Sequence, residues 1–418
     1  MTQTNSFSDS PPSRRDVIAQ AKSIVVKVGT RVLTDSEGKL DRHRIALLSQ
    51  QLCRIADTGR QTVMVSSGAV GAGMGKLGLE ERPSGLAQLQ AVAAVGQTDL
   101  IQAYETAISA QGRHAAQVLL TSSDLRRRSG YLHVRNALTQ IHDFGAIAVV
   151  NENDSVAVAE LMTTFGDNDR MAAQVAGLLS DCLLIILSDI DGLYTGPPTA
   201  PGSKLVPLVE HLDDSVFALA ADSPSSAILD GPTSQAGALP KPKASSDTQA
   251  KNASPKRIMS KGGMTSKLKA AQLATSHGHN VIIGPGRKDD VLDQIMAGQS
   301  VGTLFLAPTK SIRGRRRWIS ASAPVAGALS VDAGAAKAVT VGGGSLLAIG
   351  IKAIEGRFSQ GAVVSIRDPN GHEIARGLCN YPSDELAKIL GSPSDQIGEI
   401  LGHRPYESVV HRSNLVLS

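Results

Sequence analysis

The chain has 418 residues, of which 42% are hydrophobic and 19% are charged, as in an ordinary globular protein. Its net charge of +4 is too small, over this length, to indicate a nucleic-acid-binding protein. Its three cysteines lie far apart, its amino terminus lacks the apolar run of a signal peptide, and no apolar run approaches the ~20 residues that span a bilayer. These features argue against disulfide scaffolds and membrane spans, and we expect a cytoplasmic protein.

Strand and helix patterns alternate along most of the chain, after polar residues 1–20 that predict a disordered leader. This alternation predicts an α/β domain at residues 21–310, in which helices cover both faces of a mostly parallel sheet. Strands are predicted at 23–28, 62–65, 116–120, 146–150, 182–187 and 280–283, and helices at 41–58, 86–110, 131–141, 171–179 and 265–276.

Two stretches depart from the alternation. Residues 222–257 hold five Pro and seven Ser and no aromatic residue, which predicts a flexible surface insertion, with a docking peptide as the alternative. From about residue 313 the sequence indicates short strands and turns, including the hairpin signal Asn370-Gly371. We therefore expect a second, small and mainly β domain at 313–405.

Polar residues follow several of the predicted strands. In parallel sheets, ligands bind outside the carboxyl ends of the strands. That edge should carry Lys27 to Thr30, Ser66 to Gly75, Asn151 to Asp154 and Ser188 to Asp191. The densest stretch runs from Asn151 to Asp169, and it predicts a site for a small polar ligand.

The segment from Ser66 to Gly75 contains four glycines, which would allow backbone N–H groups to approach an anion. Its spacing fits neither a P-loop nor a dinucleotide-binding fingerprint. Two interpretations stay open at this point: contact with a phosphate or a substrate, and a tight turn whose glycines serve packing.

The lysines near the predicted edge also have two interpretations. Lys27 ends an apolar strand, and Lys267 follows a glycine turn that enters a helix. Each is suited to a phosphate contact, yet each could extend to solvent, as could Lys261. Thr265 or Ser266 could cap the helix, and Asp169 could be a simple helix-terminus charge. The chain has no HExxH and no GxSxG motif, which disfavours metal and serine hydrolases.

Six motifs in a fixed order nevertheless resemble the amino acid kinase family, in particular its members that act on glutamate. The resemblance covers the chain from about residue 23 onward, apart from the insertion, and the C-terminal part, with Gly343 to Leu347 and Gly350-Ile351, resembles a PUA domain. The six motifs are Val26-Lys27-Val28-Gly29-Thr30, Val65-Ser66-Ser67-Gly68-Ala69, Asn151-Glu152-Asn153-Asp154, Gly166-Asp167-Asn168-Asp169, Gly192-Leu193-Tyr194-Thr195 and Gly262-Gly263-Met264.

The resemblance implies transfer of the γ-phosphoryl group of ATP, with Mg²⁺, to the side-chain carboxylate of L-glutamate. The product would be L-glutamyl 5-phosphate, in the first step of proline biosynthesis. Feedback inhibition by proline and a homo-oligomer are also implied. The alternatives are kinases for N-acetylglutamate, aspartate or carbamate, and an RNA-binding protein acting through the PUA-like domain. RNA binding is the weaker expectation, because charge and aromatic content are low.

The resemblance also implies roles for individual residues. Lys27 and Lys267 would contact the transferring phosphoryl group, and Asp169 would orient these lysines. A glutamate side chain is already ionised at neutral pH, so the reaction needs positioning and charge neutralisation rather than a general base. Glutamate would be held by Ser67, Asp154 and Asn168, with Asp154 facing its ammonium group. The ATP site would be lined by Lys27, Ser188, Asp189, Lys261, Gly262, Gly263, Met264, Thr265, Ser266 and Lys267, and no residue is assigned to Mg²⁺.

Overall fold

The computed structural model describes most of the chain. The described residues are 11–35, 37–126, 128–157, 167–221, 263–308, 325–403 and 406–417. The predicted insertion at 222–257 and the basic residues 313–317 lie outside them.

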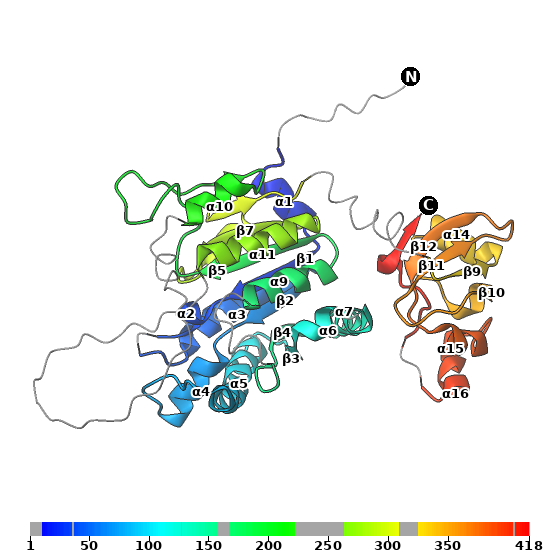
Figure 1. The fold of residues 1–418 in the computed structure, drawn as a ribbon, viewed down its shortest axis with the longest axis horizontal. Coiled ribbons are helices and arrows are strands. Elements are labelled where there is room, and N and C mark those ends of the chain that lie inside the picture. Colours follow the sequence, from blue (N-terminus) through cyan, green and yellow to red (C-terminus); the bar gives the residue numbers. More distant parts are fainter. Residues whose placement is uncertain are drawn as a thin grey trace, which may run out of the picture.

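The described part of the first unit contains an eight-stranded sheet, with the strand order β3-β4-β2-β1-β5-β7-β8-β6 (Figure 1). Neighbouring strands are parallel except β7 and β8, which are antiparallel. The predicted mostly parallel sheet is therefore confirmed. Its strands are β1 (Ser23–Val28), β2 (Gln61–Ser66), β3 (Ala115–Leu120), β4 (Ile147–Glu152), β5 (Cys182–Ser188), β6 (Leu208–Val209), β7 (Asn280–Pro285) and β8 (Thr303–Phe305).

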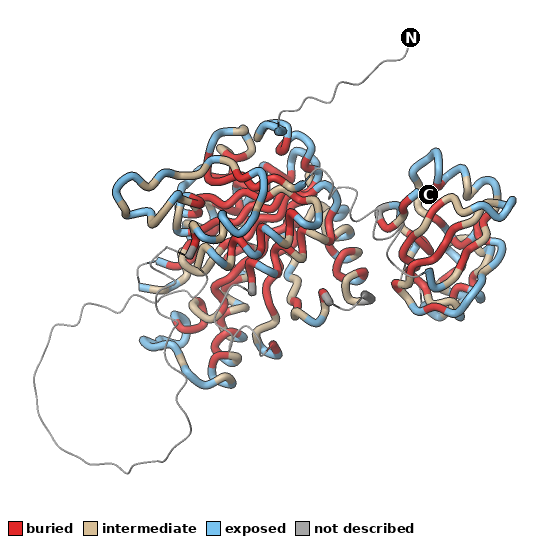
Figure 2. The backbone as a smooth tube through the Cα atoms, turned by 45° about the horizontal axis from the view of Figure 1, so that its top comes forward, coloured by how far each residue is buried: buried red, intermediate tan, exposed pale blue. Residues whose placement is uncertain are grey.

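Helices cover both faces of this sheet, and the strands form the buried centre of the unit (Figure 2). Side chains of a strand alternate between the two faces. In β1, Ile24, Val26 and Val28 pack with α3 and α5, whereas Val25 packs with α9 and α11. The helices are α1 (Arg14–Gln20), α2 (Thr30–Leu33), α3 (Arg42–Asp57), α4 (Ala69–Leu77), α5 (Leu86–Ser109), α6 (Ser122–Arg126), α7 (Arg128–Asp143), α9 (Asp167–Leu178), α10 (Asp214–Ala221), α11 (Met264–Ser276) and α12 (Val291–Met296).

Residues 14–20 form helix α1, so the prediction of a disordered leader is wrong for these residues. Residues 1–10 of that leader lie outside the described residues. Ser13 and Asp16 form a capping box at its start, which satisfies backbone N–H groups that a helix leaves free. Val17 and Ile18 are buried in the core of the sheet unit. Arg14 donates hydrogen bonds to the carbonyl oxygens of Val301 and Gly302. The sequence pattern missed this helix because only two apolar residues anchor it.

The glycine-rich segment contains a helix, α4, rather than an extended loop. Gly68 precedes the helix with a φ of 106°, a conformation that favours glycine. Gly73 faces α5 so closely that a Cβ atom there would lie 1.9 Å from the carbonyl oxygen of Val92. At Gly73, therefore, the packing interpretation is the correct one.

The C-terminal unit is small and mainly β, as predicted. Its five described strands have the order β10-β9-β11-β12-β13. The predicted hairpin joins β11 to β12, and Asp368 accepts hydrogen bonds from the backbone N–H groups of Asn370 and His372 in its turn. Strand β13 pairs with β12, so this unit extends beyond the expected limit at residue 405. Its elements are β9 (Gly327–Val331), α14 (Ala333–Thr340), β10 (Ile351–Glu355), β11 (Val363–Arg367), β12 (Glu373–Leu378), α15 (Ser383–Lys388), α16 (Ile397–Leu401) and β13 (Leu415–Leu417).

Among the described helices, none combines the length and the apolar character that crossing a membrane would require.

Candidate active site

Lys27 lies at the carboxyl end of the central strand β1. It is paired with Val65 of β2 and Ile186 of β5, and it is two residues beyond Val25. Alternation therefore turns its side chain toward the face covered by α9 and α11. The side chain is only 8% exposed, which removes the solvated interpretation for this lysine.

Asp169, in the first turn of α9, lies between two lysines. Its Oδ1 is 2.6 Å from Lys27 Nζ, and its Oδ2 is 3.8 Å from Lys267 Nζ. Ser266 Oγ also donates a hydrogen bond to Oδ2 at 3.1 Å. Because the carboxylate is 2% exposed, it is more than a helix-terminus charge. The structure thus brings together the three predicted catalytic residues.

The charges of this cluster depend on one another. Burial alone would raise the pKa of Asp169, but the nearby charges of Lys27 and Lys267 hold that pKa below its ordinary value. Burial lowers the pKa of Lys267, the charge of Asp169 opposes this, and the charge of Lys27 adds to it. A single carboxylate therefore faces two amines, and an anion bound beside them would complete the charge balance.

The N-terminus of α11 is close to this cluster. Gly263 is the residue before the helix, and no side chain caps the first turn. Thr265 and Ser266 lie inside the first turn, so neither is the capping residue, and that alternative interpretation is wrong. Free N–H groups at a helix start favour anions. Lys261 and Gly262, predicted for the same site, lie outside the described residues.

A second cluster of polar side chains joins the ends of β2 and β4 to α9. Asn168 Nδ2 donates a hydrogen bond to Ser67 Oγ at 2.8 Å and lies 3.5 Å from Asn151 Oδ1. Asn151 Nδ2 donates in turn to Gln97 Oε1 of α5 at 2.7 Å. Within the described residues, the buried Oδ1 of Asn168 has no hydrogen-bond partner. This oxygen can therefore accept a hydrogen bond from a ligand.

Asp154 follows β4 and adds a second acceptor. Its Oδ1 is buried and has no hydrogen-bond partner among the described residues. Burial and the nearby charge of Glu152 raise the pKa of Asp154, the charge of Arg82 lowers it, and the net result is a pKa of about 7. A cationic ligand beside this carboxylate would lower its pKa and so favour the ionised form.

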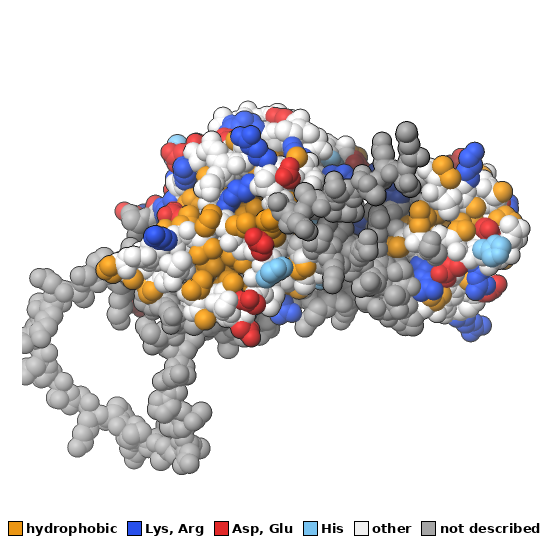
Figure 3. Space-filling view, turned by 90° about the horizontal axis from the view of Figure 1, so that it is seen from above, with side chains coloured by type: hydrophobic (Ala, Val, Ile, Leu, Met, Phe, Trp, Pro, Cys, Tyr) orange, Lys and Arg blue, Asp and Glu red, His pale blue; other side chains and the backbone are white. Residues whose placement is uncertain are grey.

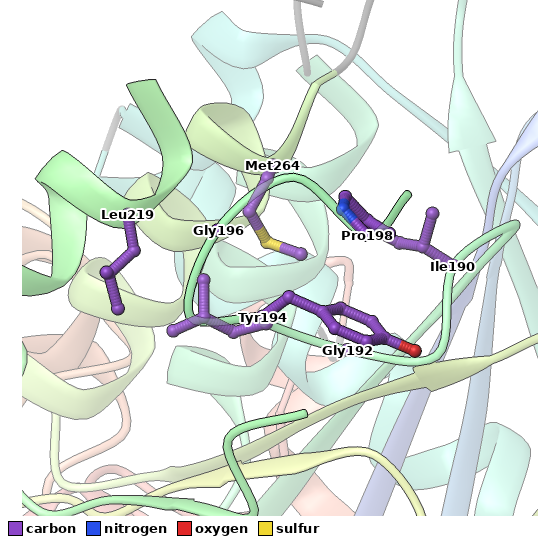
Figure 4. A pocket seen from close by; sticks show the side chains of 8 residues that line it. Ile190, Gly192, Tyr194, Gly196, Pro198, Leu219 and Met264 are labelled. Carbon is purple, nitrogen blue, oxygen red and sulfur yellow. The ribbon is translucent and has the colours of Figure 1, made fainter. Parts of the chain in front are cut away.

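Ser188 and Asp189 extend the site past the end of β5. Ser188 is buried, and its Oγ lies 3.2 Å from Asp189 Oδ1. Asp189 also forms an ion pair with Arg31 of α2, so it is more than a turn residue. Figure 4 shows a neighbouring pocket with a mostly apolar lining. Its lining residues are Ile190, Gly192, Leu193, Tyr194, Gly196, Pro198, Leu219 and Met264.

Sequence patterns missed several residues of this site. Asn151 and Glu152 were part of the polar stretch but had no assigned role. Gln97 is a single polar residue inside a helix, and Arg31 lies in the short helix after β1, so neither gave a signal. Within the described residues, no group of three or more His, Cys, Asp or Glu side chains could hold a metal ion.

Comparison with known proteins agrees with this geometry. Residues 22–285 match the model of the amino acid kinase family, and residues 327–401 match that of the PUA domain. A protein from Rhodopirellula baltica named glutamate 5-kinase is 57% identical over 404 residues, which cover 97% of this chain and 96% of that protein. Proteins of the same name from Moorella thermoacetica and Pseudomonas putida are 41% and 40% identical, and the matches cover 96% of this chain and 98% and 100% of those proteins. The chain therefore belongs to the amino acid kinase family.

Proposed function

We propose that this protein transfers the γ-phosphoryl group of ATP to the side-chain carboxylate of L-glutamate, in the first step of proline biosynthesis. The observation that carries the proposal is the buried group of Lys27, Asp169 and Lys267, which lies one residue along α9 from Asn168. The similarity of nearly the whole chain to proteins named glutamate 5-kinase supports this substrate.

Phosphoryl transfer between two anions is limited by charge and alignment. The attacking carboxylate needs no deprotonation at neutral pH, so the protein must hold two anions in line and neutralise the charge that develops between them. Lys27 and Lys267 are suited to this role because both are buried, where charges interact strongly. Asp169 keeps the two ammonium groups in place before ATP arrives.

The neighbouring cluster is suited to the amino end of glutamate. Asp154 Oδ1 and Asn168 Oδ1 are both buried acceptors without a described partner, and an ammonium group offers three donors. An N-acetylated substrate has one N–H and no charge at this position. This chemistry favours glutamate over N-acetylglutamate, and Ser67 would contact the same substrate.

ATP would occupy the side of the site formed by β5 and α11. The N–H groups at the start of α11 are suited to its phosphates, together with Ser188. The apolar pocket beside Tyr194 and Met264 is suited to one face of the base. Mg²⁺ would neutralise phosphate charge when bound, chiefly through phosphate oxygens, which this ion commonly uses with few protein carboxylates.

A chemical trap for acyl phosphates tests the proposal. Purified protein is incubated with ATP, Mg²⁺ and hydroxylamine, together with glutamate, N-acetylglutamate or aspartate in turn. We expect hydroxamate with glutamate alone. Hydroxamate with aspartate or N-acetylglutamate, and none with glutamate, would contradict the proposal and favour another kinase of the family.

Inhibition by proline and assembly into a homo-oligomer stay predictions of the family resemblance. RNA binding by the C-terminal unit stays the weaker prediction from the sequence. On the face drawn in Figure 3, basic side chains of this unit lie among acidic and uncharged ones and form no continuous basic surface. Tight RNA binding with a steep salt dependence would overturn this expectation.

A further inference from the structure

A line of amide side chains connects helix α5 to the proposed amine site. It begins at Gln97, whose Oε1 accepts a hydrogen bond from Asn151 Nδ2 at 2.7 Å. Asn151 Oδ1 accepts from the backbone N–H of Glu152 at 2.9 Å and lies 3.5 Å from Asn168 Nδ2. Gln97 is thus joined to Asn168 through Asn151.

The donors and acceptors along this line permit one orientation of each asparagine. A reversed Asn151 would place its NH₂ group against the N–H of Glu152, which can only donate. A reversed Asn168 would place its oxygen against the carbonyl oxygen of Ser66, which lies 3.5 Å from Nδ2 and can only accept. The unpartnered Oδ1 of Asn168 is thereby fixed as an acceptor for a ligand.

Gln97 is held firmly in its own position. The adjacent Gly96 packs against α4 so closely that a Cβ atom would lie 1.9 Å from the carbonyl oxygen of Ala69. Two helical turns further along α5, the hydroxyl of Tyr104 lies 3.1 Å from Ser66 Oγ. Residues seven apart share a helix face, so one face of α5 contacts the ends of both β4 and β2.

We propose that Gln97 is a positioning residue for recognition of the substrate amine. It supplies the acceptor for the buried Nδ2 of Asn151, and it thereby keeps Asn151 and Asn168 in the arrangement that presents Asn168 Oδ1 to the ammonium group. Gln97 does not touch the substrate in this scheme. The inference rests on the proposed function and adds a residue that determines amine binding.

Two substitutions of Gln97 separate the acceptor from the bulk of the side chain. Gln97→Met keeps the size and removes the acceptor, which leaves the Nδ2 of Asn151 unpaired. Gln97→Glu keeps an acceptor oxygen at the same place. Gln102→Met is the matched control, because Gln102 is an exposed residue of the same helix.

We expect Gln97→Met to raise KM for glutamate about tenfold, since an unpaired buried donor disrupts the line of amides. The kcat value should stay within about threefold, because the ammonium contact is made equally in the ground state and the transition state. Gln97→Glu and Gln102→Met should both have KM values close to that of the unaltered protein.

Glutarate, which lacks the amine, distinguishes amine recognition from general distortion of the site. Its Ki as an inhibitor competitive with glutamate should be unchanged in Gln97→Met. A Ki that rises in parallel with KM, an unchanged KM in Gln97→Met, or equal losses in Gln97→Met and Gln97→Glu would each overturn the inference. If Gln97→Met does not fold, Gln97→Asn, whose shorter side chain cannot reach Asn151, has the same expected results.

The failure of the inference can be told apart from failure of the proposed function. Unaltered protein that makes no glutamyl phosphate would remove the function. Active unaltered protein with a normal KM in the Gln97→Met variant would remove only the role of Gln97.

Discussion

Lys27 Nζ lies 2.6 Å from Asp169 Oδ1, and both side chains are almost fully buried. This contact ties the end of the central strand to the start of α9. The same carboxylate is 3.8 Å from Lys267 on α11. A buried charge is costly unless it has a partner, so the strand and both helices are held in the arrangement that places two amines side by side.

Replacement of Lys267 by Ala should reduce kcat far more than it changes KM for glutamate. We expect a loss of about 10²-fold to 10³-fold, the size seen when a group that stabilises developing charge is removed. Steady-state kinetics with both substrates measure this. Lys269→Ala is the control, because Lys269 is an exposed residue of the same helix. An unchanged kcat in Lys267→Ala would remove this lysine from the catalytic residues.

Replacement of Asp169 by Asn should destabilise the fold and reduce turnover. Two buried amines would lose their shared counter-charge, which should lower the free energy of unfolding by about 3 kcal/mol at neutral pH. Because the pKa of Asp169 is lowered in the folded state, its contribution is present above the unfolded value of about 3.9 and is lost as pH falls through the folded pKa. The difference in free energy of unfolding between the unaltered protein and Asp169→Asn should therefore become smaller in acid.

Urea unfolding at neutral and acid pH measures this difference. The control is Asp181→Asn, which removes an ion pair between two exposed side chains, Lys22 and Asp181. Such pairs contribute about 0–1 kcal/mol. Equal stability losses in the two variants would show that the buried contact of Asp169 is no stronger than a surface pair.

The sheet and the positions of Lys27 and Lys267 in the site could be predicted from the sequence. The line of amide side chains that begins at Gln97 could not. Lys27 interrupts a β-branched strand, so its position at the ligand-binding edge follows from strand periodicity and the parallel-sheet rule. Gln97 has no comparable signal, because its role depends on how closely α5 approaches β4. That approach depends on Gly73, which local pattern could not distinguish from a glycine of a turn, and on Gly96, a glycine inside a predicted helix.

The affinity for glutamate should depend on pH through Asp154. Burial and the charge of Glu152 raise the pKa of this residue to about 7 before substrate binds. Only the ionised form balances an ammonium group, so KM for glutamate should fall as pH rises from about 6 to about 8. The pH profile of kcat/KM reports the free protein and measures this directly.

Asp154→Asn provides the control for that profile. The amide cannot ionise, so KM for glutamate should be higher than in the unaltered protein and nearly independent of pH over the same range. A variant that retains the original pH dependence would assign it to another group.

The four glycines of the segment from Ser66 to Gly75 should differ sharply in their tolerance of a methyl group, and two of them make a matched pair within α4. In Gly73→Ala, the new Cβ atom would lie 1.9 Å from the carbonyl oxygen of Val92, so α4 and α5 must separate. We expect the free energy of unfolding to fall by about 1–3 kcal/mol, the usual cost of overpacking. In Gly75→Ala, the nearest atom would be Lys39 Cγ at 3.4 Å, and alanine favours a helix over glycine by about 1 kcal/mol. Gly75→Ala should therefore be as stable as the unaltered protein or more so, which thermal or urea unfolding of both variants measures. If instead both variants kept full stability and lost ATP binding, the segment would serve the phosphates and its packing role would be wrong.

The same pair of variants should also differ in their kinetics. Gly96 packs against α4 as closely as Gly73 packs against α5, so separation of the two helices should also displace Gln97. Gly73→Ala should therefore raise KM for glutamate, while Gly75→Ala leaves it unchanged.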